Sequence, residues 1–171
     1  MSIEKEVFPK MAKDGQLHAT PLAGFWADVG QPKDFLTGTA LYLNSLFQQN
    51  SSELNTGDNI VGNVMIHPSV KIGPGCKIGP NVVIGPNATI GTGVRLSDTV
   101  LMAGVTVKDF CWINGSIVGW HSSVGRWARL DATTVLGEDV HIKDEVFTNG
   151  ATVLPHKVYD ICFQIGTDGY L

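Results

Sequence analysis

A six-residue rhythm in the middle of the chain constrains its fold more than any other feature. From Ile66 to Leu96 an apolar residue recurs at every sixth position, and a smaller residue stands two places before each of them. A period of six matches neither an α-helix, which repeats every 3.6 residues or so, nor a half-buried strand, which repeats every two. A sustained hexapeptide repeat is typical of a parallel β-helix, in which each coil stacks on the one before.

Three hexapeptides make one triangular coil, so residues about 18 positions apart are expected to share a face. The predicted inward residues are Ile66, Ile84, Leu101, Val118 and Leu136 on the first face, Ile72, Ile90, Val107, Val124 and Ile142 on the second, and Ile78, Leu96, Ile113 and Leu130 on the third. The step shortens to five residues at Leu96–Leu101 and again at Ile113–Val118. We predict about five coils, wound left-handed as hexapeptide prisms usually are, in a rod about 24 Å long.

The same register predicts three columns of outward side chains: an alternating charge ladder, a tryptophan between two arginines, and a pair of aromatic rings. Their members are Asp109, Arg126 and Asp144 for the first, Arg95, Trp112 and Arg129 for the second, and Phe110 and Trp127 for the third. A guanidinium over an aromatic face is attractive. A slip of one residue would move every one of these side chains to the other side of its strand.

The residues before the repeat have a different character. Ser2 suits a helix cap and Pro9 interrupts any helix that runs through it, which predicts two short helical turns, Ile3–Phe8 and Pro9–Lys13. Leu17–Leu22 is compatible with a short strand, and an amphipathic helix is expected to begin at Pro32. The whole chain then divides into a small α/β segment at 1–47, a polar linker at 48–60, the β-helix at 61–157 and an atypical C-terminal tail at 158–171.

Composition narrows the setting in which such a chain works. Twelve basic residues against 16 acidic ones give a formal charge of −4, which offers no electrostatic case for nucleic acid or an anionic membrane. No apolar run is long enough for a transmembrane helix, and the N-terminus lacks the pattern of a signal peptide. Three cysteines without metal-ligand spacing suit a reducing compartment. We therefore expect a cytoplasmic protein.

Motifs around and within the repeat resemble the C-terminal part of mannose-1-phosphate guanylyltransferase (GDP-mannose pyrophosphorylase), especially its β-type catalytic subunit. They are Ser2–Pro9, Gly24–Gly38 and, within the repeat, Ile117–Trp120, Val135–Val140 and Asn149–Lys157. That family joins a Rossmann-like nucleotidyltransferase domain to a left-handed β-helix. It forms GDP-mannose and pyrophosphate from GTP and mannose 1-phosphate with Mg²⁺. The resemblance implies that residues 1–47 are a remnant of the nucleotidyltransferase domain.

The resemblance also implies what this sequence lacks. The glycine-rich loop that cradles the nucleotide phosphates in the family, its first metal aspartate and its sugar-phosphate lysine motif lie upstream of the part represented here. Asp28 matches the second metal aspartate, but Mg²⁺ needs further carboxylate or phosphate oxygens. We therefore expect no catalytic or nucleotide-binding residue, Mg²⁺ only in the full-length family, and a truncated chain, inactive alone, that supplies an assembly and regulatory β-helix.

Four aromatic residues are predicted to point outward from neighbouring coils: Phe110, Trp112, Trp120 and Trp127. Exposed aromatic rings that lie together often mark an interface, although β-sheet surfaces also favour aromatic residues for packing. The resemblance favours the interface, because that family assembles through its β-helix. The expected partner is a second copy of the chain or a related guanylyltransferase subunit.

Two other functions fit a hexapeptide β-helix. An acyltransferase would use a histidine base, for which His121 is the candidate, together with an acidic partner and a cleft that an inserted loop commonly supplies. No coil here carries an insertion, which favours a surface histidine. The second alternative is a non-catalytic oligomerisation scaffold.

Cys76 and Cys111 are predicted to point inward two coils apart, roughly 9–10 Å, which is too far for a disulfide.

Overall fold

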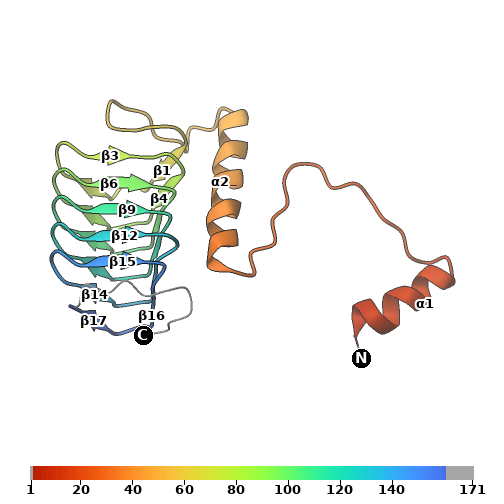
Figure 1. The fold of residues 1–171 in the computed structure, drawn as a ribbon. Helices are drawn as coiled ribbons and strands as arrows, with labels where there is room; N and C mark the ends of the chain where they lie inside the picture. The colour runs from red at the N-terminus through yellow and green to blue at the C-terminus, as the bar shows by residue number, and fades with distance from the viewer. Residues whose placement is uncertain (1, 161–171) are drawn as a thin grey trace.

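The computed structural model describes residues 2–160, and most of these wind into a parallel β-solenoid with three faces (Figure 1). The first face contains β1 (Val64–Ile66), β4 (Val82–Ile84), β7 (Val100–Leu101), β10 (Ile117–Val118), β13 (Val135–Leu136) and β16 (Thr152–Val153). The second contains β2 (Lys71–Ile72), β5 (Thr89–Ile90), β8 (Thr106–Val107), β11 (Ser123–Val124), β14 (His141–Ile142) and β17 (Val158–Tyr159). The third contains β3 (Lys77–Ile78), β6 (Arg95–Ser97), β9 (Trp112–Asn114), β12 (Arg129–Asp131) and β15 (Phe147–Asn149).

The predicted register is confirmed across both shortened steps. Ile84 pairs with Leu101, and Leu96 pairs with Ile113, each pair 17 residues apart. The inward side chains of these strands are almost completely buried in one continuous core. Both five-residue steps fall at the corner between the third and first faces, so the shortening is absorbed there and the strands keep their pairing.

The first face has six strands, one more than the five coils predicted. The pattern of apolar residues ends early because Thr148 takes the next inward place on the third face, paired with Leu130. Its hydroxyl lies 3.1 Å from the Thr134 hydroxyl, so the buried polar groups satisfy each other. Val153 follows after a third five-residue step, and β17 at Val158–Tyr159 carries the solenoid just past the boundary predicted at 157.

The two inward cysteines are free and buried, as predicted. The Cys111 thiol donates to the Gly125 carbonyl at 2.8 Å, and the Cys76 thiol donates to the Gly91 carbonyl at 3.1 Å. Burial raises the pKa of the Cys111 thiol to about 12. Because the thiolate is the reactive species, Cys111 acts as a small core residue.

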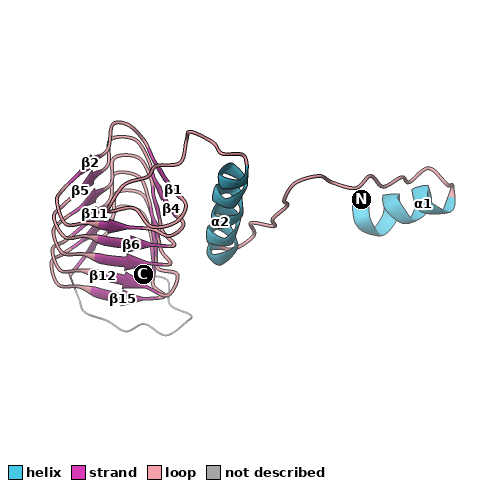
Figure 2. Cartoon of the chain, turned by 90° about the horizontal axis from the view of Figure 1, so that it is seen from above, coloured by secondary structure: helices cyan, strands magenta, loops and turns pink. Residues whose placement is uncertain are grey.

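Two helical elements form at the N-terminus as predicted, but they meet at Val7–Phe8, and Pro9 lies in the first turn of the second element instead of interrupting the helix. A π-helical turn, η1 (Ile3–Val7), leads into α1 (Phe8–Lys13), and the Ser2 hydroxyl accepts from the Lys5 N–H at 3.3 Å. The strand expected at Leu17–Leu22 is absent, because no other described strand pairs with this extended, exposed segment. In Figures 1 and 2, η1 and α1 stand well away from the solenoid.

The amphipathic helix is α2 (Pro32–Gln48), which stands beside the solenoid with its axis along the stack of coils (Figure 1). It buries Leu43 and Leu46 but leaves other large apolar side chains exposed. Among residues 2–160, no helix is both long enough and apolar enough to cross a bilayer.

Candidate functional sites

Phe110 and Trp127 form an exposed aromatic stack at the corner between the second and third faces. Their ring centroids are 4.5 Å apart with planes inclined by 24°, and the residues are 44% and 62% exposed. Both have left-handed backbone, with φ of 61° and 59°, a region that bulky residues avoid. Gly93 holds this position one coil earlier, and a Cβ there would lie 2.7 Å from the Phe110 ring. Glu145 takes the same position one coil later with φ 64°, so left-handed backbone belongs to this corner, and the exposure of two stacked rings is what distinguishes it.

Trp112 lies on the third face, in β9. The Arg129 guanidinium lies 4.1 Å from the centroid of the Trp112 ring and 5.2 Å from that of Phe147. The contact is therefore an arginine between two aromatic rings, rather than the predicted tryptophan between two arginines. Asp131 also pairs with Arg129 at 3.2 Å, which fixes the guanidinium in place.

The predicted charge ladder forms only in part. Arg126 Nε lies 3.8 Å from an Asp109 oxygen. Asp144 instead accepts from the backbone N–H of Arg126 at 2.8 Å and pairs with Lys108 at 3.7 Å. These side chains are well exposed, so the ladder places charges of both signs at the corner and contributes little to stability.

Trp120 belongs to a different corner. It lies between β10 and β11, where the first face turns into the second, and it is 51% exposed beside the exposed His121. The structure therefore stacks Phe110 with Trp127, places Trp112 on β9 in contact with Arg129, and puts Trp120 at another corner. The predicted patch of four aromatic residues is divided.

A hydrogen-bonded cluster of titratable side chains lies at the same corner as Trp120. The Asp139 carboxylate accepts from His156 Nδ1 at 3.1 Å and from His141 Nε2 at 3.2 Å, and His141 Nδ1 lies 2.8 Å from the Ser123 hydroxyl. The bond from His156 is the main cause that holds the pKa of the Asp139 carboxyl below its usual value. Sequence reasoning singled out only His121 near this cluster. The spacings of 17 residues from Asp139 to His156 and 18 between Ser123 and His141 would have revealed the rest.

The order hydroxyl, imidazole, carboxylate resembles a nucleophilic relay, but its surroundings do not support catalysis. The Asp139 and His141 side chains are about half exposed to water. The Ser123 N–H is bonded to the Val140 carbonyl at 2.8 Å, so it cannot stabilise an oxyanion. The cluster therefore joins three successive coils, and its side chains line neither of the cavities described below.

Asp28, the predicted metal ligand, is exposed in the irregular segment before α2. Nowhere in residues 2–160 do three histidine, cysteine, aspartate or glutamate side chains come together in a way that could hold a metal ion. The Mg²⁺ ion that the resemblance implies therefore has no complete site in the described part of the chain.

Two cavities flank the outward side of the first face, and both are lined in part by Met65 and Val83. The larger, about 510 Å³, lies between α2, the Phe25–Val29 segment and strands β1, β4 and β7, and its rim includes Trp26, which is 72% exposed. Its lining is almost wholly apolar. It contains no charged group that would orient a polar ligand.

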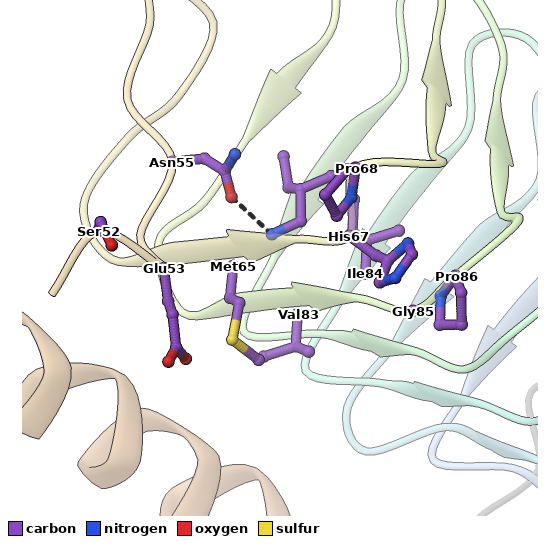
Figure 3. A pocket seen from close by; sticks show the side chains of 11 residues that line it. Ser52, Glu53, Asn55, Met65, His67, Pro68, Val83, Ile84, Gly85 and Pro86 are labelled. Atoms are coloured by element: carbon purple, nitrogen blue, oxygen red, sulfur yellow. Dashed lines mark hydrogen bonds between the residues drawn. The ribbon is translucent and has the colours of Figure 1, made fainter.

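The other cavity, about 440 Å³, lies between the linker and the first two coils (Figure 3). Apolar atoms of Met65, Val83 and Ile84 and the rings of Pro68 and Pro86 contribute to its lining, together with Ser52, Glu53, Asn55 and His67. Asn55 fixes the linker to the solenoid, because its side-chain oxygen accepts from the Ile66 N–H at 2.7 Å. Sequence reasoning treated residues 48–60 only as a linker and missed this cavity, whose only sequence signal is Glu53 together with the prolines 18 positions apart.

These features define a class of protein: a hexapeptide-repeat β-solenoid with exposed aromatic corners, preceded by a short helical segment. Residues 60–163 match the family model described as the GMPPB C-terminal domain, and the chain belongs to this family. It is 58% identical over 156 residues to a probable mannose-1-phosphate guanylyltransferase 2 of Oryza sativa subsp. japonica, covering 91% of this chain and 43% of that protein. It is 62% identical over 159 residues to a mannose-1-phosphate guanyltransferase of Hypocrea jecorina, covering 91% and 44%.

The chain thus spans less than half the length of these curated relatives. Two solved structures match at a low level. The acetyltransferase domain of PglB from Neisseria gonorrhoeae FA1090 matches 64% of this chain and 58% of its own at 18% identity with a TM-score of 0.32. A mutant GDP-perosamine N-acetyl transferase from Caulobacter crescentus matches 69% and 65% at 22% identity with a TM-score of 0.37. Likeness at this level says nothing about function.

Proposed function

We propose that this chain is the assembly and regulatory β-solenoid part of an enzyme that forms GDP-mannose and pyrophosphate from GTP and mannose 1-phosphate. The observation that carries the proposal is the 58–62% identity to mannose-1-phosphate guanylyltransferases over 91% of the chain. More than half the length of those relatives has no counterpart in this sequence. Catalysis then requires groups that the described residues do not supply.

In the complete enzyme, Asp28 would contribute one carboxylate to a Mg²⁺ site. An Mg²⁺ ion is usually held by one or two carboxylates, substrate phosphates and water. Asp28 is exposed and joined by no second acid, so the described part of this chain does not fit the ion by itself. Binding and activation of the phosphates are therefore assigned to the part of the relatives that is not represented here.

The apolar cavity beside α2 is where such a catalytic part would rest against the solenoid. Phe25 packs edge-on against Tyr42 of α2, but Phe25, Trp26 and Val29 still expose much apolar surface around the cavity. Burial of such surface is the main favourable contribution to docking. In this arrangement α2 joins the catalytic part to the stack of coils.

The aromatic stack at Phe110 and Trp127 is the proposed contact with another subunit, either a second copy or a related guanylyltransferase. Exposed aromatic rings beside arginine are the composition of interface hot spots. The mixed charges of Asp109, Arg126 and Lys108 around the stack suit a polar rim. The left-handed backbone at both rings is shared by Glu145 one coil later, so the case for this role rests on the two exposed rings.

A pyrophosphate assay tests the central proposal. The purified chain, incubated with GTP, mannose 1-phosphate and Mg²⁺, should release no more pyrophosphate than a chain-free control, whereas a full-length guanylyltransferase assayed in parallel should turn over. Turnover by the chain alone at a comparable rate would contradict the division of labour proposed here.

Acyl transfer remains the alternative, and the His141–Asp139 pair is the one observation in its favour. Neither of the two cavities is lined by Ser123, Asp139, His141 or His156. A general base needs a bound substrate within hydrogen-bonding reach. We therefore do not propose acyl transfer for this chain.

A further inference from the structure

The residues between α2 and the first coil cap a strand edge of the first face. The Asn55 N–H donates to the Val64 carbonyl at 2.8 Å, and the Asn55 side-chain oxygen accepts from the Ile66 N–H at 2.7 Å (Figure 3). These groups of β1 point away from β4, toward the N-terminal end of the solenoid. Asn55 therefore takes the place that a preceding coil would have on this face.

The same segment then caps the third face but passes by the second. Ile60 forms an isolated parallel bridge with Ile78 of β3, whose N–H donates to the Asn59 carbonyl at 2.9 Å. Asn55 and Ile60 are five residues apart, whereas Ile66 and Ile78, on the same two faces of a complete coil, are twelve apart. The segment is therefore too short to place a strand over the second face on its way.

The edge of β2 that faces away from β5 is left open as a result. β2 is an end strand of its sheet. One coil later, the Ala88 and Ile90 carbonyls accept backbone bonds from the coil of β2 at 3.1 and 2.8 Å. The equivalent carbonyls of the first coil belong to Val70 and Ile72, and no N–H of residues 2–160 donates to either. The Ile72 N–H points the same way and has no acceptor among those residues, so this edge is a template for pairing with another chain.

A hollow of about 290 Å³ lies over this edge, at the end of the solenoid core. Its apolar lining includes Ile60, Ile66, Val70 and Ile72, which pack against the core but are only partly buried. These are the positions on which inward side chains of a preceding coil would pack. Apolar side chains that entered the hollow would therefore gain the burial that such a coil provides.

Lys71 determines which charge is favoured beside the open edge. Its side chain points outward from β2, is exposed, and forms no ion pair within residues 2–160. Its cross-strand neighbour in β5 is the uncharged Thr89. Because opposite charges on facing strands attract and like charges repel, an acidic residue across from Lys71 is preferred.

We propose that the open edge of β2 binds an extended segment of another polypeptide by strand addition. The backbone of the segment bonds to Val70 and Ile72, two of its apolar side chains enter the hollow, and an acidic residue between them faces Lys71. The residues just before Asn55 do not take this place, because Asn55 is bonded to β1. The inference rests on the open edge and is independent of the proposed enzymatic function.

Amide hydrogen exchange of the isotope-labelled chain, followed by NMR, tests the proposal at a single backbone group. The probe is a capped five-residue peptide in which isoleucine, glutamate and isoleucine stand between two threonines. At a peptide concentration about ten times Kd, exchange of the Ile72 amide should slow about tenfold, because only the free chain exchanges. The Ile78 amide is already bonded to Asn59 and should not change.

A second peptide, with N-methyl groups on its three central residues, keeps every side chain but lacks the backbone donors, so it should not bind. No slowing at Ile72 with the first peptide, or equal slowing with the methylated one, would overturn the proposal. The first outcome would mean that Lys71 and the shortness of β2 keep this edge unpaired.

A charge reversal tests the contact with Lys71. A peptide with lysine in place of glutamate should bind the unsubstituted chain about fivefold more weakly or worse, because an attractive cross-strand pair becomes repulsive. Lys71→Glu should reverse this preference. Lys77→Glu, at the equivalent exposed position of β3, whose edge is capped, should leave it unchanged. A preference that survives Lys71→Glu, or that both variants reverse, would contradict the placing of the acidic residue.

Discussion

Individual residues in this solenoid are constrained most tightly where consecutive coils touch at a corner. A Cβ built on Gly125 would lie 2.3 Å from the Lys143 carbonyl carbon, which is backbone and cannot move aside. Any side chain at this position, polar or apolar, would meet the backbone of the next coil. Gly30, by contrast, has its nearest such neighbour at 3.7 Å.

This difference predicts the effect of two alanine substitutions. Gly125→Ala should lower the free energy of unfolding by about 2 kcal/mol or more, because overpacking forces the backbone of two coils apart. Gly30→Ala should change it by less than about 0.5 kcal/mol. Urea unfolding followed by circular dichroism measures both, and equal stability of the two variants would contradict the close approach.

Burial also predicts the reactivity of a single thiol. With its pKa raised to about 12, Cys111 is almost entirely protonated at pH 8 and should not react with a thiol reagent in the folded protein. A chain with Cys76→Ser and Cys162→Ser isolates it. The expected result is no modification over an hour without denaturant and complete modification in guanidinium. Rapid labelling of the folded variant would mean that the coil opens at Cys111.

At the scale of elements, the last coils are held together by side chains as well as by strand pairing. Asp139 receives bonds from His141 in its own coil and from His156 in the next. The folded-state pKa of Asp139 is lowered, so its contribution to stability is present above the ordinary carboxyl pKa of about 4 and is lost as the pH falls below it.

Asp139→Asn should therefore lower the melting temperature at pH 6 to 7, and the difference from the unsubstituted chain should disappear by about pH 3. Thermal unfolding across this range measures it. Asp14→Asn, at an exposed helix end with no such partners, is the control and should show no comparable pH-dependent difference. A difference that grows as the pH falls would refute the assigned sign.

The elements also show what could be predicted from the sequence. Strand register followed from apolar spacing, because each inward residue packs against its equivalent one coil away. The sixth coil was missed because Thr148 is polar and its partner Thr134 is visible only in three dimensions. The prediction of a strand at Leu17–Leu22 was wrong, because a strand needs a neighbouring strand, which the local sequence does not reveal. The cavity at Glu53 depends on the path of the linker, which carries no repeat.

For the whole molecule, the proposed subunit contact makes a prediction about assembly. Phe110→Ser combined with Trp127→Ser should convert an oligomer into smaller species, because both exposed rings are lost from one corner. Trp120→Ser, at the other corner, should leave the assembly intact. Light scattering coupled to size-exclusion chromatography measures the mass. A monomeric unsubstituted chain, or dissociation by Trp120→Ser alone, would contradict the assignment.

The shortened steps have a consequence for how this architecture tolerates changes in length. Three of the five turns from the third face to the first use five residues, whereas Ile78–Ile84 and Leu130–Leu136 use six. The extra length of Leu130–Leu136 is taken up by Ala132 and Thr133, both in left-handed backbone at φ 53° and 66°. Deleting Thr133 would give this turn the same length as its neighbours without moving an inward side chain out of phase. The stacking of the coils therefore does not require a fixed number of residues in each coil. Insertions and deletions of single residues should accumulate at this corner.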